Sequence, residues 1–366
     1  MGATRRETKQ VRAGTVAFGA GAPISVQSMT KTDTRDAQAT LGQVRKLTEA
    51  GCEVVRIAVP DEDAARALTA IRAGTHAVLV ADIHFNYRLA IMSMEAGVDK
   101  LRINPGNIGG EARVREVVRC AADRDIPIRI GVNAGSLEPD LLARYGMTPR
   151  AMVESARRHV GILESFGFEK IVVSLKASDV WTTVEAYRLA ASVMPYPLHL
   201  GLTEAGPPPS GIIRSAVALG ILLGEGIGDT IRVSLTGDPI AEVHAGREIL
   251  QALGLRRFGP VIISCPTCGR SRTALAETAE AVRRSLAGLN VPITVAIMGC
   301  EVNGPGEARH ADVGLACGAG FGLLFRRGEA VRRVPEKEMV SALVALAHDV
   351  ARNAAAAEEN RGSDRR

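Results

Sequence analysis

The sequence predicts an α/β protein: a (β/α)8 barrel of the TIM type followed by a smaller α+β domain. Between residues 24 and 253, eight short β-rich runs alternate with eight helical patterns. Alternating β–α units indicate a parallel sheet with helices outside it. Eight consecutive units favour closure into a barrel over an open sheet. Beyond residue 258 the regular alternation stops, which indicates a second domain.

The expected strands are short and rich in Val, Ile and Leu, as strands buried in a parallel sheet usually are. They cover residues 24–29, 54–59, 77–83, 100–103, 127–132, 170–175, 198–202 and 230–235. The expected helices carry apolar residues at helical spacing. They cover residues 38–50, 62–73, 87–96, 111–122, 149–166, 180–193, 212–223 and 240–253. Glycine, which is common just after a helix, stands at positions 51, 74, 97, 167 and 254.

The second domain is expected to contain strands at 261–264, 294–298 and 322–325 and helices at 274–287 and 337–351. We therefore divide the chain into a barrel, residues 1–258, and a second domain, residues 259–352. Residues 353–366 are polar and alanine-rich and are expected to form a disordered tail. The polar head before residue 14 is expected to be mobile.

Composition excludes several functional classes. With 46% hydrophobic and 23% charged residues, the 366-residue chain has the make-up of a soluble globular protein. Only 3% of residues are aromatic and the net charge is +5, so a nucleic-acid surface is not expected. We expect no membrane span and no secretory signal, and hence a cytoplasmic protein. Six cysteines in such a chain favour metal or redox chemistry over disulfides.

Polar residues gather where the expected barrel strands end. The carboxyl ends of barrel strands meet at one mouth, where barrel enzymes carry out their chemistry. Buried parallel strands are usually apolar, but these ends carry charged and polar side chains: Arg56, Asp82, His84, Arg102, Asn104, Arg129, Asn133, Ser174, Lys176, Thr203, Glu204, Arg232 and Ser234.

Four of these residues are arginines and one is a lysine, which predicts a multiply charged anionic substrate. Guanidinium groups match phosphate oxygens two at a time, and the glycine-rich turn at 104–110 could add backbone N–H donors. The alternative is that the arginines pair with Asp82, Glu204 and helix carboxylates. His84 and Glu204 are the candidates for proton transfer.

Three cysteines indicate a metal site in the second domain. Cys265 and Cys268 form a CxxC motif directly after one expected strand, and Cys300 follows another. Three thiolates on two turns suit either zinc or an iron–sulfur cluster. For zinc, Cys317 or His310 could supply the fourth ligand, so both metals remain open on spacing alone.

Several segments together resemble a known family. They are residues 55–60, 81–85, 101–109, 128–136, 176–179, 201–205, 224–229, 265–268 and 299–307. In these segments the chain resembles the bacterial 4-hydroxy-3-methylbut-2-enyl diphosphate synthases of the methylerythritol phosphate route to isoprenoids. It departs from the family in the proline-rich loop 206–211 and in the additional Cys317.

The resemblance implies an oxidoreductase that reductively opens 2-C-methyl-D-erythritol 2,4-cyclodiphosphate to (E)-4-hydroxy-3-methylbut-2-enyl diphosphate. It implies a [4Fe–4S] cluster and flavodoxin or ferredoxin as the electron donor. It also implies a homodimer with shared active sites, in which the cluster domain of one subunit caps the barrel of the other.

The resemblance also implies roles for individual residues. Cys265, Cys268, Cys300 and Glu307 would hold the cluster, and Glu204, His84 and Glu307 would be catalytic. The expected substrate-binding residues are Arg56, Asp82, Arg102, Asn104, Arg129, Asn133, Lys176, Thr203, Arg232 and Ser234. The alternatives are a phosphate-binding barrel enzyme with a structural zinc and, more distantly, a nucleic-acid-binding zinc module.

Overall fold

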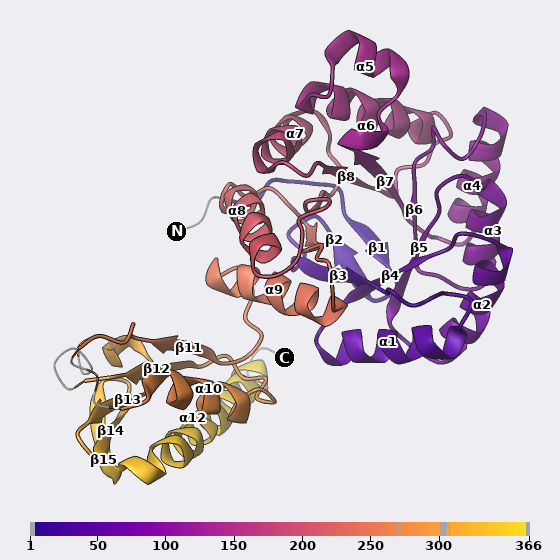
Figure 1. The fold of residues 1–366 in the computed structure, drawn as a ribbon. Coiled ribbons are helices and arrows are strands. Elements are labelled where there is room, and N and C mark those ends of the chain that lie inside the picture. The colour runs from indigo at the N-terminus through magenta and orange to yellow at the C-terminus, as the bar shows by residue number, and fades with distance from the viewer. Residues whose placement is uncertain (1–3, 270, 272, 301–305, 307, 364–366) are drawn as a thin grey trace. The chain divides into compact units, whose positions relative to one another are not determined.

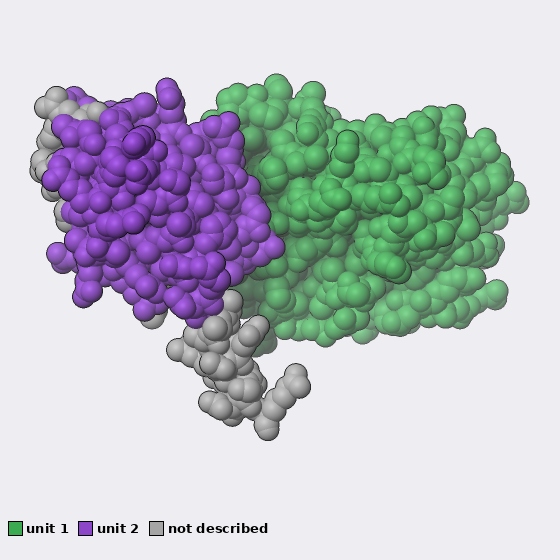
Figure 2. All heavy atoms as spheres, turned by 90° about the horizontal axis from the view of Figure 1, so that it is seen from below, with its two compact units in different colours: residues 1–256 green, residues 257–366 purple. Residues whose placement is uncertain are grey.

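The computed structural model describes residues 4–269, 271, 273–300, 306 and 308–363. The chain divides into two compact units, Met1–Arg256 and Arg257–Arg366 (Figure 2). The division therefore falls two residues before the boundary that the sequence predicts. Among the described helices, none combines the length and the apolar character needed to cross a membrane.

The first unit is a parallel eight-stranded barrel, as the sequence predicts. In the sheet the strands follow the order β8-β7-β6-β5-β4-β3-β10-β9, and a bridge between Val173 and Leu198 joins the two ends. The strands are β3 (Ser25–Met29), β4 (Val54–Ala58), β5 (Val78–Asp82), β6 (Lys100–Ile103), β7 (Ile128–Asn133), β8 (Ile171–Lys176), β9 (His199–Leu200) and β10 (Thr230–Ile231).

A ring of helices surrounds these strands (Figure 1). Most begin at a side chain that accepts a hydrogen bond from a first-turn backbone N–H, which fixes where the helix starts. The capping residues are Asp36, Asp61, Asn86, Thr148, Asp179 and Asp238. The helices are α1 (Ala37–Glu49), α2 (Glu62–Ala73), α3 (Tyr87–Glu95), α4 (Glu111–Asp123), α6 (Pro149–Glu164), α7 (Val180–Val193), α8 (Ser210–Gly224) and α9 (Pro239–Ala252).

From residue 4 onward the amino-terminal head is ordered, so the expectation of a mobile head is wrong for residues 4–13. It forms a hairpin of β1 (Val11–Ala13) and β2 (Val16–Phe18), which packs against Val54 and Val78 at the starts of two barrel strands. Arg6 donates hydrogen bonds to backbone carbonyls at 191, 194 and 196. Apolar burial and these arginine contacts hold a segment whose composition alone suggested mobility.

The barrel departs from the expected elements in two further places. A short helix, α5 (Pro139–Tyr145), and a 3-10 turn (Ala134–Ser136) lie between β7 and α6. Strands β9 and β10 have two residues each and are shorter than predicted.

The second unit is a five-stranded sheet with helices on one face. Strands β11 to β13 are parallel, and β14 and β15 continue the sheet in antiparallel order. One apolar core joins residues of both helices to alternate residues of β12 and β13. The elements are β11 (Val261–Ser264), α10 (Leu275–Ser285), β12 (Thr294–Met298), β13 (Val313–Gly318), β14 (Phe321–Arg326), β15 (Glu329–Pro335) and α12 (Met339–Ser363).

Within the described residues helix α12 continues to Ser363, past residue 352, where the sequence analysis ends the second domain. The last three residues of the expected disordered tail, 364–366, lie outside the described residues. Residues 354–357 are four consecutive alanines. Alanine has the highest helix propensity of all residues. The segment therefore extends a helix that the apolar core has already fixed upstream.

Candidate active site at the mouth of the barrel

A cavity of about 210 Å³ lies at the carboxyl ends of the barrel strands. All of the expected substrate-binding residues except Asp82 and Asn104 line it, so the structure brings together residues of four strands, β4, β6, β7 and β8, and of the segments that follow β9 and β10. Its lining residues are Arg56, Arg102, Arg129, Asn133, Ser174, Lys176, Leu202, Thr203, Arg232 and Ser234.

Asp82, the last residue of β5, lies between two of the arginines. Its Oδ2 is 2.5 Å from Arg56 Nη2, and its Oδ1 is 3.2 Å from Arg102 Nη1. Burial alone would raise the pKa of this carboxyl, but Arg56, His84 and Arg102 lower it well below its usual range. Asp82 is therefore ionised at neutral pH, so it offsets one of the two positive charges and orients both guanidinium groups.

Arg129 and Lys176 have no such carboxylate. Arg129 is 1% exposed, and its Nε and Nη2 have no hydrogen-bond partner among the residues that the structure describes. Burial lowers the pKa of both side chains, and the neighbouring arginines lower it further. Within the described residues neither forms an ion pair with an acidic side chain. Buried charges are normally paired, so these two cations are available to an anionic ligand.

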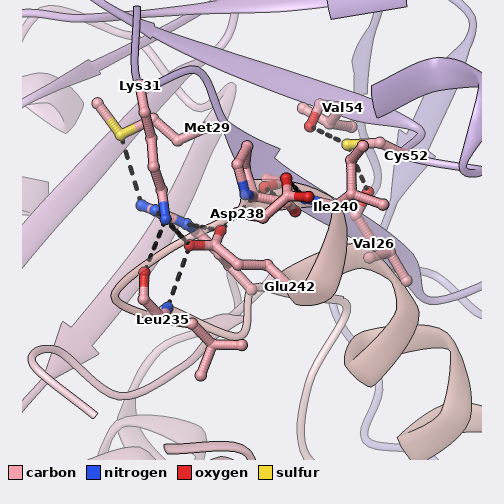
Figure 3. A network of polar contacts seen from close by, with 12 residues as sticks. Val26, Met29, Lys31, Cys52, Val54, Leu235, Asp238, Ile240 and Glu242 are labelled. Carbon is pink, nitrogen blue, oxygen red and sulfur yellow. Dashed lines mark hydrogen bonds and ion pairs between the residues drawn. The ribbon is translucent and has the colours of Figure 1, made fainter. Parts of the chain in front are cut away.

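The last cation of the mouth, Arg232, pairs with a residue that the sequence analysis missed. Glu242, in the first turn of α9, is completely buried, and its Oε2 lies 3.2 Å from Arg232 Nε. Figure 3 shows Glu242 beside Lys31 and Leu235. The alternative that carboxylates neutralise the arginines thus holds for Arg56, Arg102 and Arg232, with Asp82 and Glu242 as the partners.

Asn104 shapes the glycine-rich turn after β6. Its Oδ1 accepts a hydrogen bond from Gly106 N over 3.1 Å. Behind this turn lies the buried His159 of α6, and a Cβ on Gly106 would come within 2.7 Å of its Nε2. The same nitrogen is 3.1 Å from Glu138 Oε1. A Cβ at position 106 would therefore force the His159 ring to move, and His159 is a second buried residue that the sequence analysis did not single out.

The two candidates for proton transfer lie outside the cavity lining. His84 is half-exposed, with Nε2 3.3 Å from Asp82 Oδ2 and 3.0 Å from Arg102 Nη1. Glu204 is exposed, and its φ of +54° holds it in the left-handed region. His84 follows Asp82, the last residue of β5, by two residues, and Glu204 directly follows Thr203 of the cavity lining, so both residues lie in segments that border the mouth.

The cysteines of the second unit lie at the carboxyl ends of neighbouring strands. Cys265 directly follows β11, Cys300 follows β12 by two residues, and these strands pair in parallel. The backbone N–H of Gly299 donates to Cys265 Sγ over 3.2 Å, so this sulfur lies against the turn that follows β12. Soft thiol donors from two adjacent turns fit an iron–sulfur cluster or zinc.

The described residues do not complete a metal site by themselves. No three of their His, Cys, Asp and Glu side chains are grouped closely enough to hold a metal ion. Glu307 lies outside the described residues. Cys317 is fully buried in β13, and burial raises the pKa of its thiol, while Thr273 opposes the rise and Cys265 adds to it.

Comparison with known families covers almost the whole chain. Residues 8–247 match the GcpE TIM-barrel domain, and residues 261–349 match the GcpE protein C-terminal domain. The chain belongs to the GcpE family. This confirms the resemblance that the sequence motifs indicated, and it makes the chain an iron–sulfur oxidoreductase.

Relatives of the GcpE chain are similar over nearly their full length. A protein of Geobacter sulfurreducens is 60% identical over 93% of this chain and 97% of its own. One from Dehalococcoides mccartyi is 55% identical over 93% and 98%. One from Maridesulfovibrio salexigens is 56% identical over 91% and 94%. Each is named 4-hydroxy-3-methylbut-2-en-1-yl diphosphate synthase (flavodoxin).

Among solved structures, the GcpE chain matches a dihydropteroate synthase from Yersinia pestis. The match covers 67% of this chain and 98% of the other, with 14% identity and a TM-score of 0.48. At this level of similarity it carries no weight for fold or function.

Proposed function

We propose that this chain reductively opens 2-C-methyl-D-erythritol 2,4-cyclodiphosphate to (E)-4-hydroxy-3-methylbut-2-enyl diphosphate. The observation that carries the proposal is the pair of buried cations without carboxylates, Arg129 and Lys176, in the barrel mouth. The mouth holds five cations, and Asp82 and Glu242 offset only part of their charge. Such an excess suits a diphosphate. The names of the relatives support the same reaction.

The charge balance of the reaction matches these two cations. The conversion takes up two electrons and one proton, breaks one carbon–oxygen bond to the diphosphate, and releases a hydroxyl group as water. The opened diphosphate then carries one more negative charge than the ring. Arg129 and Lys176 are placed to stabilise that charge as it develops, and preorganised donors of this kind contribute strongly to catalysis.

The remaining residues orient the substrate or move the proton. Arg56, Arg102 and Arg232 bind phosphate oxygens with guanidinium groups whose directions Asp82 and Glu242 fix. Asn133, Thr203 and Ser234 add neutral hydrogen-bonding groups to the cavity lining. His84 and Glu204, at the rim, are the proposed donors of the proton that leaves with the hydroxyl group as water.

Cys265, Cys268, Cys300 and Glu307 are the proposed ligands of a [4Fe–4S] cluster. When bound, the cluster would supply the two electrons and a Lewis-acidic iron. A carboxylate is a weaker ligand for iron than a thiolate, so Glu307 would be the most easily exchanged of the four ligands. We therefore expect Glu307→Cys to retain a cluster and lose nearly all turnover, whereas Cys317→Ala keeps both. Iron content and turnover measure the two effects, and the reverse pattern would assign the fourth position to Cys317.

The proposed enzyme is a homodimer with shared active sites, served by flavodoxin or ferredoxin in the cytoplasm. Helix α9 ends at the barrel face opposite the mouth, and the second unit begins at Arg257 a few residues later. Large apolar side chains are exposed around the mouth, among them Phe85 at 76% and Trp181 at 59%. Exposed apolar groups of this kind often mark a contact surface, and a second copy would cover them.

Mixing two inactive variants tests the shared site. Glu204→Gln damages the barrel and Cys265→Ser damages the cluster, so a mixed dimer would assemble one intact site from two chains. We expect activity to return on mixing. Absence of activity after verified subunit exchange would exclude shared sites.

Anaerobic turnover tests the reaction itself. Purified protein with a low-potential reductant should convert the cyclodiphosphate to the linear allylic diphosphate, identified by mass. The same preparation should contain iron and sulfide. Colourless protein with stoichiometric zinc and no turnover would instead support the phosphate-binding enzyme with a structural zinc.

A further inference from the structure

A completely buried carboxylate stands behind the barrel mouth without lining the cavity. This is Glu242, in the first turn of α9. We propose that Glu242 is a positioning residue, which fixes the guanidinium of Arg232 in the orientation that binds the substrate diphosphate. The identity of the ligand rests on the proposed function, whereas the geometry of Glu242 and Arg232 does not.

Both oxygens of Glu242 face Arg232. Oε2 lies 3.2 Å from Arg232 Nε, and Oε1 lies 3.5 Å from Nη2. This is the two-point arrangement in which a carboxylate fixes the plane of a guanidinium as well as its position. Arg232 Nη1 lies 3.5 Å from Met29 Sδ. One N–H on Nη1 and one on Nη2 remain for a ligand, since a guanidinium has five N–H donors.

Other groups hold Glu242 itself in place. Ser28 Oγ donates to its Oε2 over 2.9 Å, and the backbone N–H of Leu235 donates to its Oε1 over 3.1 Å. Ser28 lies in β3, and Leu235 follows β10, the strand that pairs with β3. The carboxylate thus has a fixed direction before any ligand arrives, which lowers the cost of ordering Arg232 on binding.

Lys31 completes this arrangement from the segment after β3 (Figure 3). Its Nζ lies 3.3 Å from Glu242 Oε1 and donates to Leu235 O over 2.7 Å and Gly237 O over 2.5 Å. All three ammonium donors are therefore used inside the protein. Lys31 ties the loops after β3 and β10 together, so it belongs to the support of Arg232 and not to the cations available to substrate.

Glu242→Gln keeps the shape of the side chain and removes its charge. The new amide group places N–H donors where Glu242 accepts from Arg232 and Ser28, or from Leu235 and Lys31, so one oxygen loses its partners. We expect the affinity for the cyclodiphosphate and for inorganic pyrophosphate, measured by calorimetry, to fall by roughly tenfold to a hundredfold. The Michaelis constant should rise more than the turnover number falls.

A matched control separates positioning from general destabilisation. Asp229 is a buried carboxylate at the other end of β10, 3.0 Å from Arg5 Nη2, and its Oδ2 accepts from Leu198 N over 2.8 Å. Asp229→Asn removes the same charge from a similar setting far from the mouth. We expect it to lower stability without changing either affinity.

A double-mutant cycle decides whether Glu242 acts through Arg232. In an Arg232→Met background, Glu242→Gln should change the affinity less than twofold, because the group that it positions is gone. An equal loss of affinity in both backgrounds, or no loss in the single variant, would overturn the proposal. If Glu242→Gln does not fold, Glu242→Asp, which shortens the reach to Arg232, enters the same cycle.

The two probes keep this proposal separate from the proposed function. A wild-type protein that binds pyrophosphate, but neither binds nor converts the cyclodiphosphate, would refute the reaction. The pyrophosphate cycle would still decide the role of Glu242. A wild-type protein that converts the cyclodiphosphate while Glu242→Gln binds both ligands normally would refute the positioning role alone.

Discussion

Replacing Arg129 by methionine should make the ligand-free protein more stable and a poorer binder. Arg129 is 1% exposed, its Nε and Nη2 lack hydrogen-bond partners, and Arg56 and Arg102 repel it. Each unsatisfied buried group costs about 1–3 kcal/mol, and arginine does not escape the cost by losing its proton. Methionine fills most of the same volume without charge. We therefore expect a gain of about 2 kcal/mol in the free energy of unfolding.

Urea unfolding followed by circular dichroism measures the gain, and calorimetry with the cyclodiphosphate measures the expected loss of affinity of about ten- to a hundredfold. The control is Arg158→Met. Arg158 is exposed and bonds to Asp140 on the outside of the barrel, so both quantities should stay close to the wild-type values. A less stable Arg129→Met protein with undiminished affinity would refute the view that the Arg129 guanidinium is available to bind an anionic ligand.

Two further predictions concern the same cavity. Burial and neighbouring arginines lower the pKa of Lys176. Between that lowered pKa and about 10.4, unfolding takes up a proton, so the free energy of unfolding rises with pH. Lys176→Met should flatten this rise when urea unfolding is measured across the pH range, and an unchanged slope of stability against pH would contradict the lowered pKa of Lys176. In Gly131→Ala, the added Cβ would lie 2.4 Å from Arg102 Nε, so the guanidinium must move. We expect calorimetry to show weaker binding of the cyclodiphosphate and circular dichroism to show little change in fold. An affinity equal to that of the wild type would show that Arg102 does not contact the ligand.

Much of the barrel could be predicted because its signals are local. Apolar strand runs and helical spacing recur along the β–α units, glycine follows five of the eight expected helices, and the polar residues that break the pattern at 56, 102, 129 and 176 all line the cavity. Short elements carry weaker signals. The hairpin β1–β2 has three residues in each strand, and strand β15 is almost entirely exposed, so its charged sequence lacks the apolar alternation of a strand.

Glu242 shows what a single sequence leaves undetermined. A glutamate in the first turn of a helix is expected at the surface, where it interacts favourably with the helix dipole. Whether it points outward or into the barrel depends on the rotation of α9 against β3, which is a tertiary property. His159 was missed for the same reason. It packs against Gly106, which is far away in the sequence, and this contact is also a tertiary property.

The amino-terminal hairpin packs against the barrel at the amino-terminal ends of its strands. Phe18 is fully buried with Lys100 Nζ 3.8 Å from the centre of its ring, and Gly14 packs against Asp99 at the start of β6. Because the hairpin packs over this end of the barrel, a ligand of the cavity would enter and leave through the mouth. The exchange of ligands would then depend on what covers the mouth. A chain shortened at its amino terminus would admit solvent to the barrel from the end opposite the mouth.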